Sequence, residues 1–173
     1  MNGLGVADSL VVGPGNVIVT LCHFLSSPAT LAAVPSVGDS GVLGFTPFGE
    51  LRMQTIAHSP VGYAIEAGVL DELEAMLHAD RHLVSNVIGD PHMHVELSSA
   101  LELESGDTYV IASDGLFDNI HTPEIVRYLH KGSLSQSTRQ LVEECRRRML
   151  QPTEGQPSKP DDLTLIAFRP RIL

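Results

Sequence analysis

Short runs of β-branched and other apolar residues recur along the chain, and turn-forming residues bound most of them. A short, continuous apolar run predicts a buried strand. The segment Thr46-Pro47-Phe48-Gly49 lies between two such runs and predicts a hairpin turn. The predicted strands span residues 17–21, 30–37, 42–45, 51–56, 95–97, 108–112 and 163–168.

Helical spacing replaces the strand pattern in three segments. Residues 66–78 carry apolar side chains three and four positions apart, with acids between them. Thr122 and Pro123 are typical of a helix start, and the helix that they open stops near Gly132. A longer helix is predicted over residues 135–150. Hairpin-linked strands with segregated helices favour an α+β fold over a doubly wound parallel sheet.

Composition narrows the class of protein and its partners. A chain of 173 residues with 43% hydrophobic residues predicts one domain, residues 1–173, with a core of its own. The net charge of −10 has the wrong sign for a nucleic-acid phosphate backbone or an anionic membrane surface, so no nucleic acid and no membrane partner are expected. Cys22 and Cys145 are far apart and no leader segment is visible, which predicts reduced thiols and a cytoplasmic location.

Carboxylates stand at three predicted strand ends. Asp114 follows the run 108–112 and is followed by Gly115, Asp161 precedes the run 163–168, and Asp39 lies in a glycine turn. Three such acids are the oxygen ligands that a hard cation such as magnesium or manganese prefers. An aspartate in a glycine turn is also ordinary turn chemistry. Spacing alone therefore leaves open an acidic α+β binding module that holds no metal.

Four segments, in this order, resemble motifs of the PPM-type (type 2C) metal-dependent protein serine/threonine phosphatases. They are Val37-Gly38-Asp39-Ser40-Gly41, residues 81–89, Ala112-Ser113-Asp114-Gly115-Leu116-Phe117-Asp118-Asn119 and Pro160-Asp161-Asp162-Leu163-Thr164. The motifs are clearest within residues 34–168. The resemblance implies a β-sandwich flanked by helices on both faces (α/β/β/α), with part of one helical layer missing here.

The resemblance also implies a two-metal site that uses Mn²⁺ or Mg²⁺. Asp114 and Asp161 match metal-binding aspartates, and Asp39 matches a position linked to a further, weaker metal. Gly38, Gly115 and Asp162 are assigned supporting roles. Two such cations activate a water that attacks a phosphoserine or phosphothreonine ester, so the implied substrate is a phosphoprotein.

The first part of the chain departs from the family pattern. The family has an arginine that grips phosphate and an Asp-Gly-x-Gly-Gly motif whose first acid bridges both metals. The nearest match is Val6-Ala7-Asp8-Ser9, which makes Asp8 the candidate bridging acid, and Arg52 is expected to be a surface residue. The chain is thus either an N-terminally shortened or divergent phosphatase, or a catalytically impaired domain with an interaction or regulatory role. A missing helical layer would expose apolar sheet surface, which a homodimer or another partner would cover.

Overall fold

The computed structural model describes residues 8–12 and 31–170 of the chain. The strands are β1 Asp8–Val12, β2 Leu31–Ala32, β3 Pro35–Ser36, β4 Gly41–Phe45, β5 Leu51–Gln54, β6 Glu96–Leu97, β7 Leu101–Glu102, β8 Thr108–Ala112 and β9 Leu165–Arg169. The helices are α1 Pro60–Glu66, α2 Glu72–Leu77, α3 Asp114–Phe117, α4 Thr122–Leu129 and α5 Leu134–Leu150. No helix among these residues is long and apolar enough to cross a membrane.

A five-stranded antiparallel sheet organises the described part of the chain. Its strand order is β1-β9-β8-β4-β5. The register pairs Gly41 of β4 with Ala112 of β8, and Ala112 with Leu165 of β9. The start of β4, the end of β8 and the start of β9 therefore lie at the same end of the sheet, which is where the sequence carries its aspartates.

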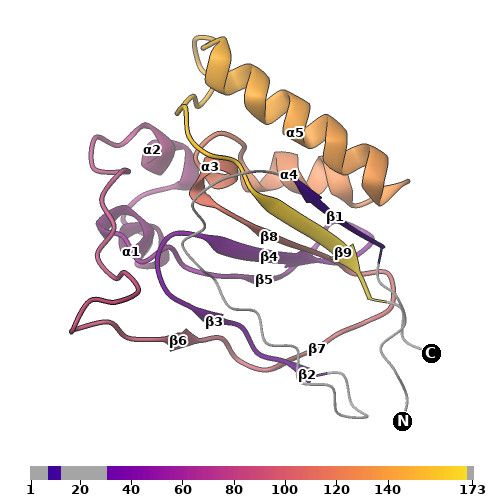
Figure 1. The fold of residues 1–173 in the computed structure, drawn as a ribbon, viewed down its shortest axis with the longest axis horizontal. Coiled ribbons are helices and arrows are strands. Elements are labelled where there is room, and N and C mark those ends of the chain that lie inside the picture. Colours follow the sequence, from indigo (N-terminus) through magenta and orange to yellow (C-terminus); the bar gives the residue numbers. More distant parts are fainter. Residues whose placement is uncertain (1–7, 13–30, 171–173) are drawn as a thin grey trace.

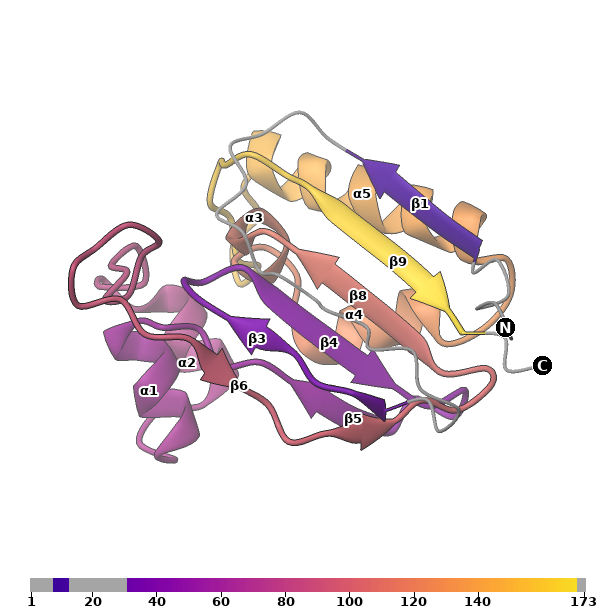
Figure 2. The ribbon, with the colours of Figure 1, turned by 60° about the horizontal axis from the view of Figure 1, so that its bottom comes forward.

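The elements form layers around this sheet (Figures 1 and 2). Helices α4 and α5 cover one face, and the short strand pairs β2-β7 and β3-β6 lie on the opposite side. Helices α1, α2 and α3 gather at the end where β4 begins and β8 ends. The α+β prediction is confirmed. Within the described residues, however, helices cover only one of the two outer faces, so the α/β/β part of the predicted sandwich is present.

The core lies between the sheet and the α4–α5 layer. Strand β4 is buried along its whole length because it has neighbours on both faces. Helices α4 and α5 turn their apolar stripes towards the sheet. The fully buried members of this core include Leu43, Phe45, Val110, Leu116, Ile120, Ile125, Leu129, Leu141, Cys145 and Leu165.

Several predicted elements differ from the structure. The helix expected over 66–78 is shorter: α1 ends at Glu66, the chain turns at Gly68 with φ +69°, and α2 begins only after Asp71, which caps it. Leu73 and Leu77, two of the apolar residues at helical spacing in this segment, are exposed. The strand expected over 30–37 is divided into β2 and β3. The strand expected over 17–21 lies outside the described residues, and the sequence pattern did not predict β1, β7, α1 or α3.

Candidate active site

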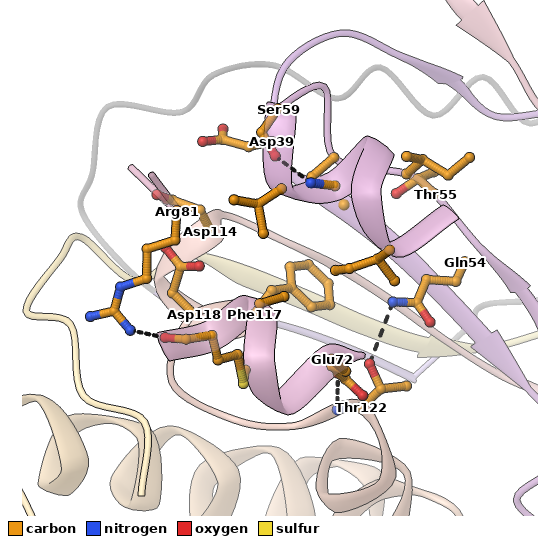
Figure 3. Close-up of a pocket in the computed structure, with 18 of the residues that line it drawn as sticks. Asp39, Gln54, Thr55, Ser59, Glu72, Arg81, Asp114, Phe117, Asp118 and Thr122 are labelled. Carbon is orange, nitrogen blue, oxygen red and sulfur yellow. Dashed lines mark hydrogen bonds between the residues drawn. The ribbon is translucent and has the colours of Figure 1, made fainter. Parts of the chain in front are cut away.

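The end of the sheet described above gathers aspartates from three segments. Asp39 lies in the turn between β3 and β4, Asp114 opens α3 directly after β8, and Asp161 lies in the segment that leads into β9. The register of the sheet, not proximity in the sequence, brings these residues to one place. Figure 3 shows Asp39, Asp114 and Asp118 beside one pocket.

Close backbone packing joins α3 to the segment before β9. The Ser113 hydroxyl donates to the carbonyl of Asp162 at 3.0 Å and accepts from the Thr164 N–H at 3.1 Å. A Cβ at Gly115 would stand 2.3 Å from the same Asp162 carbonyl oxygen, a distance that no side chain tolerates. Glycine is thus required after Asp114, because the two segments that carry the aspartates touch there.

Asp114, Asp161 and a further aspartate, Asp118, meet around the ammonium group of Lys159. Its Nζ lies 3.1 Å from Asp114 Oδ2, 2.5 Å from Asp118 Oδ2 and 3.5 Å from Asp161 Oδ2. We call Asp114, Asp118 and Asp161 the acid cluster. The side chain of Lys159 is 20% exposed, so the ammonium is largely withdrawn from solvent.

Asn119 fixes the backbone of Lys159. The Asn119 side chain accepts from the Lys159 N–H at 2.7 Å and donates to the Lys159 carbonyl at 2.8 Å. It also donates to the Gly115 carbonyl at 2.9 Å, and the residue is fully buried. Neighbouring Ser158 is held as well, since its carbonyl accepts from Arg81 at 3.1 Å and its hydroxyl donates to the Arg148 carbonyl at 2.8 Å. The position of Lys159 is therefore set by buried hydrogen bonds.

Burial and neighbouring charges both shift the pKa values of the ionisable groups in this region. Burial raises the pKa of Asp39, and the nearby negative charge of Asp114 raises it further. Burial also raises the pKa of Asp118, against the lowering effect of the Lys159 ammonium. Burial alone would lower the pKa of Lys159, but its contacts with Asp118 and Asp114 raise that pKa above its usual value. Lys159 thus stays protonated and offsets part of the negative charge of the site.

A pocket of about 300 Å³ adjoins the acid cluster. Asp39, Asp114 and Asp118 line it at the end nearest the cluster, together with Arg81 (Figure 3). The rest of its wall comes from β4, β5, α1, α2 and α3 and is largely apolar, including Val42, Ile56, Val61, Ile65, Ala75, Met76 and Phe117. A concave apolar pocket with a few charged groups at one end is typical of a ligand site.

The structure brings only some of the predicted site residues together. Asp114 and Asp161 lie together, and Asp39 borders the same pocket as Asp114. Gly38 has φ +97°, and its N–H donates to His58 Nδ1 at 3.2 Å. Asp162 is exposed, and it is its backbone carbonyl that contacts α3.

Asp8 is not brought to the acid cluster. The backbone of Asp8 pairs with Arg169 at the far end of β9, whereas Val12 pairs with Leu165 at the near end. Four residue steps along a strand span about 13 Å, so the bridging role expected for Asp8 has no support in this register. Arg52 lies on β5 with 25% of its side chain exposed, and it pairs with Asp107 at 3.0 Å and Glu104 at 2.5 Å.

Sequence analysis missed two members of the site, Asp118 and Lys159. Asp118 lies four residues after Asp114, which puts both acids on one side of a helical turn once α3 is known. Lys159 lies two residues before Asp161, and only its hydrogen bonds to Asn119 reveal that it points inward. No signal in the sequence distinguishes it from a surface lysine.

The carboxylates of the acid cluster are of the chemical type that binds divalent cations. Three carboxylates that share one cationic partner are the ligands that Mg²⁺ and Mn²⁺ prefer. Among the described residues, however, no three acidic, histidine or cysteine side chains are spaced to enclose a metal ion directly. In this structure the cationic partner of the three carboxylates is the Lys159 ammonium.

The known proteins that are similar to this chain include protein phosphatases. No family model matches the chain. A Streptococcus pyogenes serotype M6 protein named "Putative protein phosphatase 2C-type" is 34% identical over 113 residues, which cover 62% of this chain and 44% of that protein. The Mycobacterium tuberculosis serine/threonine phosphatase PstP/Ppp matches with a TM-score of 0.68 at 25% identity, covering 87% of this chain and 59% of that one.

A further structure shares the fold. The catalytic domain of PstP, solved with two manganese ions, matches with a TM-score of 0.65 at 23% identity, covering 88% of this chain and 59% of that one. In each comparison the chain spans less than two thirds of its relative's length. The resemblance read from the motifs is thus confirmed: the chain is similar in sequence and in its α+β fold to the PPM-type protein serine/threonine phosphatases.

Proposed function

We propose that this protein hydrolyses phosphoserine or phosphothreonine esters in proteins with the help of divalent cations, Mn²⁺ or Mg²⁺. The observation that carries the proposal is the convergence of Asp114, Asp118 and Asp161 on one cation position beside a pocket. Bound cations of this kind lower the pKa of a water molecule and offset the charge of a phosphate group. An acidic chain of net charge −10 would otherwise repel such a substrate.

Each part of the site has a role in this proposal. Asp114 and Asp161 are the proposed metal ligands, and Asp118 is a third carboxylate that contacts the same Lys159 ammonium. Asp39 borders the pocket next to Asp114 and adds negative charge for a further, weaker cation. The apolar part of the pocket offers room for a side chain that flanks the phosphorylated residue.

A second candidate function is that of a catalytically impaired phosphatase-like domain with an interaction or regulatory role. Two observations favour it. The register of β1 puts the Asp8 backbone at the end of the sheet away from the acid cluster. The ammonium of Lys159 also pairs with the carboxylates that would bind the metal. A domain of this kind would keep the fold and lose turnover.

Release of phosphate from a phosphoserine or phosphothreonine peptide discriminates between the two functions. We expect turnover with millimolar manganese, none with a chelator, and loss of the metal-dependent turnover in Asp114→Asn and Asp161→Asn. Asp90→Asn is the matched control, because Asp90 is an exposed aspartate in the segment between α2 and β6. A folded wild-type protein without turnover at any manganese concentration would rule out the catalytic function and favour the regulatory one.

A further inference from the structure

The ammonium group of Lys159 occupies the position that a divalent cation would need. It lies within 3.5 Å of a carboxylate oxygen from each member of the acid cluster. A hard divalent cation draws on carboxylate oxygens as ligands. An ammonium group uses the same oxygens as hydrogen-bond acceptors. The two cations would therefore compete for the Oδ2 atoms of the three carboxylates.

The fold builds this lysine into the site. Asn119 binds both backbone polar groups of Lys159, and Pro160 restricts the chain directly after it. The other lysine of the sequence, Lys131, is exposed in the turn after α4. Lys159 is thus held by buried groups on the side of its backbone and by three acids on the side of its ammonium.

We propose that Lys159 is an internal counter-ion that competes with the divalent cation for the acid cluster. Without metal it holds the three carboxylates together, and metal binding requires its ammonium to leave. Three carboxylates and one ammonium retain net negative charge, so a divalent cation is still attracted. This inference rests on the proposed metal-dependent function and concerns the regulation of that same site: Lys159 would set the metal concentration at which the site fills.

Titration of manganese into the full chain tests the proposal, with free Mn²⁺ followed by electron paramagnetic resonance. Lys159→Gln removes the charge, Lys159→Arg keeps it, and Lys131→Gln is the matched control. Removal of a positive charge at contact distance from the cation position is expected to tighten manganese binding at least about tenfold. Lys159→Arg is expected to bind manganese no tighter than the wild type, and Lys131→Gln is expected to bind it as the wild type does.

Thermal unfolding gives a second readout that does not depend on activity. Without metal, Lys159→Gln leaves three carboxylates facing one another, so its melting temperature is expected to fall and to recover when manganese is added. Manganese affinity that is unchanged or weaker in Lys159→Gln, while the wild type binds the ion, would overturn this inference and leave the proposed function standing. A variant that fails to fold even with manganese would also overturn it. Absence of manganese binding in all four proteins would overturn both proposals.

Discussion

Asn119→Ala tests whether the segment before β9 depends on the buried amide that fixes Lys159. The substitution removes three hydrogen bonds of 2.7, 2.8 and 2.9 Å at a side chain with 0% exposure. Each bond contributes about 0.5–1.5 kcal/mol to stability, and a buried partner left unsatisfied costs more. The lost bonds join α3 to Lys159, so we expect the free energy of unfolding to fall by about 2–4 kcal/mol.

Urea unfolding, followed by far-ultraviolet circular dichroism, measures this loss. Gln140→Ala on the exposed side of α5 is the control, and its effect is expected to stay within about 0.5 kcal/mol. A loss below about 1 kcal/mol in Asn119→Ala would contradict the reasoning, because it would mean that water or another side chain satisfies the three groups as well as the amide does.

Two further predictions concern packing and pH. Gly115→Ala puts a methyl group 2.3 Å from the Asp162 carbonyl oxygen, so the segment before β9 must move. We expect the free energy of unfolding, measured by urea unfolding, to fall by about 1–3 kcal/mol. An unchanged urea midpoint would refute the contact. The hydrogen bond from Arg147, helped by Arg148, lowers the pKa of Glu144 to about 2 from its usual 4.5. The unfolded chain therefore binds the proton more tightly, so the stability from Glu144 is present above pH 4.5 and is lost as pH falls towards 2. Glu144→Gln should flatten this acid dependence of the urea midpoint, and a variant as acid-sensitive as the wild type would argue against the ion pair.

The sequence predicted the sheet and the α4–α5 layer where local patterns are strong. Strand β8 and helix α5 fall close to their predicted bounds, because a continuous apolar run and a long amphipathic stripe are local signals. Asp114 and Asp161 could be paired from the motifs alone, and the antiparallel register of β8 with β9 explains why they meet.

The rest of the site depends on tertiary contacts that no local pattern carries. The helix that periodicity predicts over 66–78 is shortened to α2, since the chain turns at Gly68 with a positive φ before that helix begins. The direction of the Lys159 side chain follows from Asn119, which lies 40 residues earlier in the chain. Asp8 matched a motif by residue type, but a β1 that runs antiparallel to β9 puts its backbone at the other end of the sheet.

Anomalous diffraction at the manganese edge, from crystals soaked in manganese, tests the central claim most directly. That claim is that the acid cluster holds a divalent cation in place of the Lys159 ammonium. The account predicts an anomalous peak among Asp114, Asp118 and Asp161, with the ammonium displaced from its present contacts. Crystals that show no peak there, with Lys159 still bound to all three aspartates at millimolar manganese, would contradict it.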